Sequence, residues 1–120
     1  ANYFPEEKVK GEHFVCKKNE IPLGGTRTFV IEGSTIPYVL IHLEDGQLRA
    51  YEQKCTHLSC AVFYKPKSGQ IECPCHNGLF DALTGEVLAG PPPRPLPRLD
   101  VLMKGADIFV SALPENHNRT

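Results

Sequence analysis

Short runs of apolar residues alternate with polar ones along most of the chain, and no window keeps an apolar period of about 3.6 residues over three turns. The runs are rich in Val, Ile, Phe, Tyr and Thr, and eleven prolines and ten glycines separate them. The pattern therefore predicts an all-β fold. The expected strands are residues 13–17, 26–32, 38–43, 47–51, 61–64, 70–72, 87–88, 98–103 and 107–111.

Turn-forming residues lie between most of these strands. Residues 44–46 and 104–106 each contain a glycine that can supply the positive φ of a tight hairpin. Residues 66–69 are expected to close a further hairpin, and residues 81–85 form a polar turn. The first 11 residues and the last seven carry little pattern, so we expect them to be extended or frayed.

The length of 120 residues predicts a single domain, residues 1–120. We expect a base formed by residues of about 12–51 and 93–113 and a small inserted unit of about 52–92. The 13 basic and 14 acidic residues give a net charge of -1 without a basic run, which argues against nucleic acid as a partner.

No apolar stretch approaches the 18 or more residues of a membrane-spanning helix, and no signal segment opens the chain. We therefore expect a soluble piece. Because it begins with Ala1 and not Met, it is expected to be either a mature exported protein or the head of an anchored one.

Six residues in two short segments carry the candidate chemistry. Cys55 and His57 are two apart in Cys-Thr-His-Leu-Ser-Cys, and Cys73 and His76 are three apart in Cys-Pro-Cys-His. Each segment can present one thiolate and one imidazole to the same point, a set that suits a [2Fe-2S] cluster with sulfur on one iron and nitrogen on the other. A further cysteine in each segment, Cys60 or Cys75, is placed to tie the two together. The predicted function is electron transfer.

Zinc is the main alternative, because two thiolates and two imidazoles can also close a tetrahedral structural site. A zinc site would leave Cys60 and Cys75 as spare thiols beside the metal, whereas a cluster pinned by a disulfide uses all six residues. The fifth cysteine, Cys16, lies in an alternating apolar run, and we expect it to be a buried, unreactive thiol.

These motifs resemble those of Rieske iron–sulfur proteins of the cytochrome bc and b6f type, and residues 90–95 resemble the proline-rich loop that covers the cluster in that family. The resemblance implies an antiparallel β-sandwich with a small inserted cluster-binding subdomain. It implies that Cys55 and Cys73 bind the inner iron and that His57 and His76 bind the outer one. It also implies a disulfide between Cys60 and Cys75, and shielding of the cluster by Leu58, Pro74, Pro91, Pro92 and Pro93.

The same resemblance implies a one-electron carrier, the iron–sulfur subunit or soluble head of a quinol-oxidising respiratory complex. Cytochrome b-type and c-type subunits, and a quinol, would then be its partners, with a membrane reached only through them or through an anchor. The alternative is a soluble small subunit or ferredoxin of another oxidoreductase, of the arsenite-oxidase or dioxygenase type. A disulfide would place the protein in an oxidising compartment, in bacteria the periplasm or the outer face of the cytoplasmic membrane.

The chain departs from high-potential members of that family just after His76. Those members have a serine and a tyrosine whose hydroxyls donate hydrogen bonds to cluster sulfurs, and Gly78 and Phe80 stand at these positions here. Fewer donors stabilise the reduced state less, so we expect a lower reduction potential. Gly78→Ser is then expected to raise it.

Overall fold

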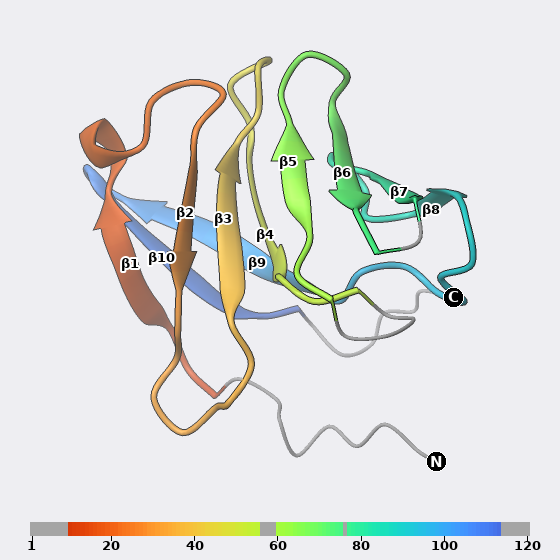
Figure 1. The fold of residues 1–120 in the computed structure, drawn as a ribbon. Helices are drawn as coiled ribbons and strands as arrows, with labels where there is room; N and C mark the ends of the chain where they lie inside the picture. The colour runs from red at the N-terminus through yellow and green to blue at the C-terminus, as the bar shows by residue number, and fades with distance from the viewer. Residues whose placement is uncertain (1–9, 56–59, 76, 114–120) are drawn as a thin grey trace.

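The computed structural model describes residues 10–55, 60–75 and 77–113, which form two antiparallel sheets (Figure 1). The six-stranded sheet has the order β1 (His13–Lys17), β10 (Asp107–Ala112), β9 (Arg98–Lys104), β4 (Leu48–Glu52), β3 (Tyr38–His42) and β2 (Thr26–Phe29). The four-stranded sheet has the order β5 (Phe63–Lys65), β6 (Gln70–Cys73), β7 (Gly78–Asp81) and β8 (Val87–Ala89). A short 3-10 helix, Lys18–Glu20, follows β1.

Strand β3 is buried on both faces, which explains why its five residues are nearly all apolar. Alternate side chains of a strand point to opposite faces. Leu40 accordingly packs into one buried cluster with Ala50 of β4, its neighbour in register, while Val39 packs into a second cluster with Tyr51. The strand therefore separates two cores.

The first core lies between the two halves of the six-stranded sheet, where β1, β9 and β10 fold over β2, β3 and β4 (Figure 1). Its buried members are Cys16, Ile21, Ile31, Ile36, Tyr38, Leu40, Ala50, Leu99, Ile108 and Val110. The second core lies between β3, β4 and the four-stranded sheet. Its buried members are Val39, Ile41, Leu43, Tyr51, Cys55, Val62, Ile71, Cys73, Phe80, Ala82 and Leu96.

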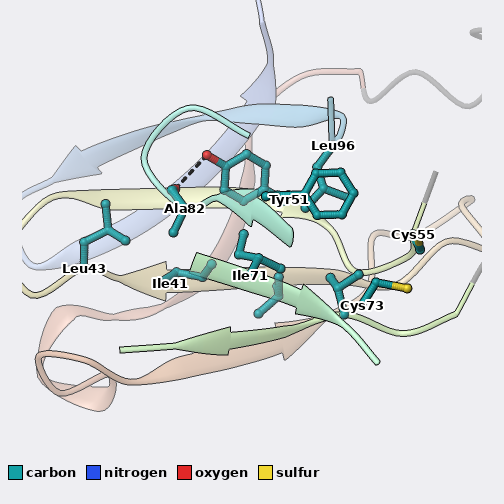
Figure 2. Close-up of a cluster of buried hydrophobic side chains, with 11 residues drawn as sticks. Ile41, Leu43, Tyr51, Cys55, Ile71, Cys73, Ala82 and Leu96 are labelled. Atoms are coloured by element: carbon teal, nitrogen blue, oxygen red, sulfur yellow. Dashed lines mark hydrogen bonds between the residues drawn. The ribbon is translucent and has the colours of Figure 1, made fainter. Parts of the chain in front are cut away.

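Tyr51 connects the two sheets directly. Its side chain is fully buried, and its hydroxyl donates a hydrogen bond of 2.8 Å to the carbonyl oxygen of Ala82, in the turn after β7 (Figure 2). Gly85 closes on the same ring, because a Cβ atom at this glycine would lie 2.9 Å from Tyr51 Cε1. This close approach fixes the turn of the four-stranded sheet against β4.

The all-β prediction is confirmed, and hairpin turns occur at Gly46, Gly69 and Gly105, each with positive φ. Strand β7 and the short 3-10 helix were not predicted. Strand β7 begins with a glycine next to the second cysteine segment, and its pairing to both β6 and β8 depends on contacts that only the folded chain provides. Strand β2 ends at Phe29, short of the predicted residue 32, because Phe29 pairs with Tyr38, the first residue of β3, and the preceding Pro37 has no N–H to continue the ladder.

The division into a base and an inserted unit stays a prediction. Among the described residues, no helix is long and apolar enough to cross a membrane.

Candidate metal centre

The two predicted cysteine ligands lie at the same end of the second core (Figure 2). Cys55 follows β4 and is 3% exposed, while Cys73 ends β6 and is fully buried. The two sheets therefore bring together thiols that are 18 positions apart in the sequence. The other predicted ligands, His57 and His76, lie outside the described residues, as does Leu58.

A disulfide joins the segments that carry these two cysteines. Cys60 is bonded to Cys75, across a sequence separation of 15 residues, with their Cα atoms 6.4 Å apart. Within the first segment, the backbone N–H of Cys55 donates a hydrogen bond of 2.7 Å to the carbonyl oxygen of Cys60. This backbone bond and the disulfide therefore hold Cys55 in place relative to the second segment.

The proline-rich segment packs against this end of the molecule through Pro92, which is buried. Pro91 and Pro93, on either side of it, are exposed, and so is Pro74 of the second cysteine segment. Leu96 anchors the far end of the proline-rich segment, because it is 2% exposed in the second core and its N–H donates a hydrogen bond of 3.0 Å to the carbonyl oxygen of Gly85.

The residues after His76 have a specific backbone geometry. Asn77 has a φ of 57°, in the left-handed region, which Asn tolerates better than most residues. Gly78 follows and pairs in register with Cys73. Phe80, two residues on, is fully buried in the second core. The sequence did not single out Asn77 or Gly90 as residues that shape the backbone at this site, although both are types that accept positive φ.

Cys16 lies in the first core, away from the two site cysteines in the second. It is 1% exposed, and burial raises the pKa of its thiol above the ordinary value. The expectation of a buried, unreactive thiol is thus supported by both its burial and its pKa. His42 is also buried, and its Nδ1 lies 3.0 Å from the carbonyl oxygen of Ile21, to which it can donate a hydrogen bond.

The described residues fit an iron–sulfur cluster. Thiolates are the usual protein ligands of such clusters. The buried thiols of Cys55 and Cys73 lie at one end of the second core, in segments linked by a disulfide. The apolar surroundings of Cys55 and Cys73 would also exclude water from a bound cluster, which is one way a protein sets its potential.

Comparison with known proteins identifies the family. Residues 11–100 match the model of the Rieske [2Fe-2S] domain, so the chain belongs to this family and its cofactor is a [2Fe-2S] cluster. Family membership decides between the two metal predictions in favour of the cluster and against zinc.

Individual proteins agree with this assignment. The chain is 34% identical to the cytochrome b6-f complex iron–sulfur subunit of Chlorobaculum thiosulfatiphilum, over 89% of this chain and 58% of that one. It is 29% identical to the 3-phenylpropionate/cinnamic acid dioxygenase ferredoxin subunit of Photorhabdus laumondii, over 85% and 95%. The plasma membrane Rieske protein of Synechocystis PCC 6803 has a similar structure, with a TM-score of 0.71 and 31% identity over 82% and 98%. The chain thus spans a little over half of the Chlorobaculum subunit.

Proposed function

We propose that this chain carries single electrons as the iron–sulfur subunit, or its soluble head, of a quinol-oxidising complex of the cytochrome bc type. Its redox partners would be cytochrome b-type and c-type subunits, with a quinol as a possible electron donor. The observation that carries the proposal is the disulfide between Cys60 and Cys75. Rieske proteins of the bc and b6f type, which the chain resembles, have this additional cysteine in each cluster-binding segment.

The ligands we propose are Cys55 and Cys73 for the inner iron and His57 and His76 for the outer iron. When bound, the cluster accepts and releases one electron at a time. The burial of Cys55 and Cys73 supports their placement on the inner side. A histidine ligand leaves a second ring nitrogen that can hold or release a proton, so His57 and His76 would couple proton transfer to electron transfer at the site where a quinol or another donor docks.

Pro92 supports the covering role that we propose for the proline-rich segment, since it is buried against the strand that leaves the second cysteine segment. Pro74, Pro91 and Pro93 are exposed and would form the outer surface of that cover. We place the protein in the periplasm or on the outer face of a bacterial cytoplasmic membrane, because a structural disulfide persists in oxidising compartments.

A second candidate is a soluble ferredoxin or small subunit that serves another oxidoreductase. The similarity to a dioxygenase ferredoxin subunit along 95% of its length favours it. Ferredoxins of that kind usually lack the additional cysteine in each segment, so the bond between Cys60 and Cys75 weighs for the first candidate.

Purification from the native membrane, with identification of the bound subunits, distinguishes the two candidates. The first predicts that the chain co-purifies with b-type and c-type cytochromes and is reduced when a quinol is added. Co-purification with an oxygenase or a molybdenum subunit, and no reduction by quinol in the presence of the cytochromes, would favour the second.

Single substitutions test the ligand assignment. Cys55→Ala and Cys73→Ala, and likewise His57→Ala and His76→Ala, should each abolish the electron paramagnetic resonance signal of the reduced cluster. Cys16→Ala is the matched control, because Cys16 is equally buried but lies in the other core. A normal signal in any of the four ligand variants would remove that residue from the set.

We further propose a reduction potential below that of ubiquinol-oxidising relatives, within the range of about -150 to +300 mV that Rieske centres span. Gly78 and Phe80 support this, because neither side chain can donate a hydrogen bond to the cluster. Protein-film voltammetry at neutral pH measures the potential. Phe80→Tyr should raise it, whereas a wild-type value at the upper end of the range would contradict the argument.

A further inference from the structure

Two glycines that are 12 positions apart in the sequence lie next to each other near Cys73. Gly78 opens β7, and Gly90 follows the end of β8 and begins the proline-rich segment. A Cβ atom at Gly90 would lie only 2.7 Å from the Cα atom of Gly78 and 3.2 Å from the carbonyl oxygen of Asn77. Carbon atoms in contact are normally about 3.5–4.0 Å apart, so the two backbones can approach this closely only without a side chain at Gly90.

Pro92 closes the contact from the other side. A Cβ atom at Gly78 would lie 2.9 Å from Cγ and 3.1 Å from Cδ of Pro92, both less than a normal contact. The same Cβ atom would be 3.5 Å from Cβ of Cys73, which is an ordinary contact. Gly78 and Pro92 are both buried, so a side chain at position 78 has no free direction, and the proline ring is what obstructs it.

We propose that Gly78, Gly90 and Pro92 form a seat that positions the proline-rich segment over the segment of Cys73, and that they thereby set how closely the cluster is covered. We call these three residues the glycine seat. The inference rests on the proposed function, because it takes Cys73 as a cluster ligand. The three residues are positioning residues, which act on the cluster through the cover and through Cys73.

The glycine seat gives Gly78 a role beyond the absence of a serine hydroxyl. In this chain, a serine at position 78 would bring a hydroxyl near the cluster and at the same time push Pro92 away. The expected rise in potential from the added donor therefore requires that Pro92 also change. The effect of a substitution at Gly78 therefore depends on the residue at position 92, and the two positions together set the environment of the cluster.

A double-mutant cycle tests this coupling. Gly78→Ala adds only the obstructing Cβ atom, and Pro92→Ala removes the Cγ and Cδ atoms that it would meet. Gly78→Ala alone should lower the melting temperature by about 5–10 °C, the expected effect of overpacking in a domain of this size. In the Pro92→Ala background the same substitution should cost less than half as much.

Gly90→Ala tests the second contact, with Gly33→Ala as its matched control. Both glycines have nearly the same left-handed conformation, with φ of 92° and 89°, but nothing lies within 4 Å of a Cβ atom at Gly33. The control therefore measures the backbone strain alone. Gly90→Ala should lower the melting temperature by clearly more than Gly33→Ala does.

The reduction potential and the electron paramagnetic resonance g-values separate positioning from mere stability. Gly78→Ala should shift the reduction potential and the g-values. In the double variant Gly78→Ala/Pro92→Ala, both quantities should lie close to those of the Pro92→Ala single variant. Gly78→Ser should raise the potential only in the Pro92→Ala background.

Two results would overturn the glycine seat: additive effects of Gly78→Ala and Pro92→Ala on the melting temperature, or a rise in potential for Gly78→Ser with Pro92 intact and stability unchanged. Either can occur while the ligand variants behave as proposed. A failure of the glycine seat is therefore distinguishable from a failure of the proposed function. The latter would appear as a cluster signal that survives loss of Cys73, or as no reduction by quinol in the presence of the cytochromes.

Discussion

Replacing Tyr51 by phenylalanine removes one oxygen atom from the contact between the two sheets. The ring stays in place, so no cavity of a whole side chain is created. The carbonyl oxygen of Ala82, whose residue is 1% exposed, loses the hydroxyl that donates to it at 2.8 Å. A buried acceptor left without its donor costs about 1–3 kcal/mol. We therefore expect Tyr51→Phe to lower the free energy of unfolding at neutral pH by this amount.

The loss should depend on pH, because burial raises the pKa of Tyr51 from 10.0 to about 12. The folded chain then holds the phenol proton more tightly than the unfolded chain does. The resulting stabilisation is fully present below pH 10 and is lost as the pH rises to about 12. A rise of this size corresponds to roughly 2–3 kcal/mol. The stability difference between wild type and Tyr51→Phe should therefore shrink over this window, and can reverse.

Urea unfolding of both proteins at a series of pH values from neutral to alkaline measures this difference. Tyr64→Phe is the control: burial also raises the pKa of Tyr64, but this residue is only half-buried, so its substitution should change the stability less. Equal alkaline losses in wild type and Tyr51→Phe would refute the assigned pKa. Equal stabilities at neutral pH would refute the role of the hydrogen bond to Ala82.

Two further predictions concern the site and the second core. Cys60→Ser should lower the free energy of unfolding by about 3 kcal/mol, the chain-entropy value for the 15-residue loop that the disulfide closes. It should also speed the loss of the cluster absorbance. An unchanged melting temperature and cluster content would contradict this prediction. Phe80→Ala should lower the free energy of unfolding by about 3–5 kcal/mol, because the ring is fully buried. Leu88→Ala, at a 49% exposed position, should change it by less than about 0.5 kcal/mol, and similar losses for both would show that the ring does not hold the core.

Local patterns predicted most of the strands because each is short and bounded by turn residues whose backbone preferences act over a few positions. The segment of residues 78–81 shows the limit of such patterns. It contains alternation, with Phe80 buried and Leu79 partly exposed, but it begins with a glycine and adjoins the cysteine segment. Its identity as a strand depends on hydrogen bonds to β6 and β8, which lie on either side of it only in the folded sheet.

The ligand types and their spacing could be predicted from the sequence, because a cluster requires particular side chains at short separations. The structure places Cys55 and Cys73 in one core and joins their segments by a disulfide, while the set of four ligands stays a prediction. The close contact between Gly78 and Pro92 could not be predicted from the sequence. A glycine in a motif signals only a missing side chain, and which atoms fill the space depends on a segment that arrives 14 positions later in the sequence.

The amino-acid sequence by itself determined the class of fold and the family, and it predicted a set of cluster ligands, because strand alternation, turn chemistry and ligand spacing are local properties. Tertiary structure alone decided which glycines lie in close contact with distant residues, which proline is buried and how Tyr51 connects the two sheets. These are contacts between backbone atoms and rings that are distant in the sequence, and they form only when both cores are closely packed.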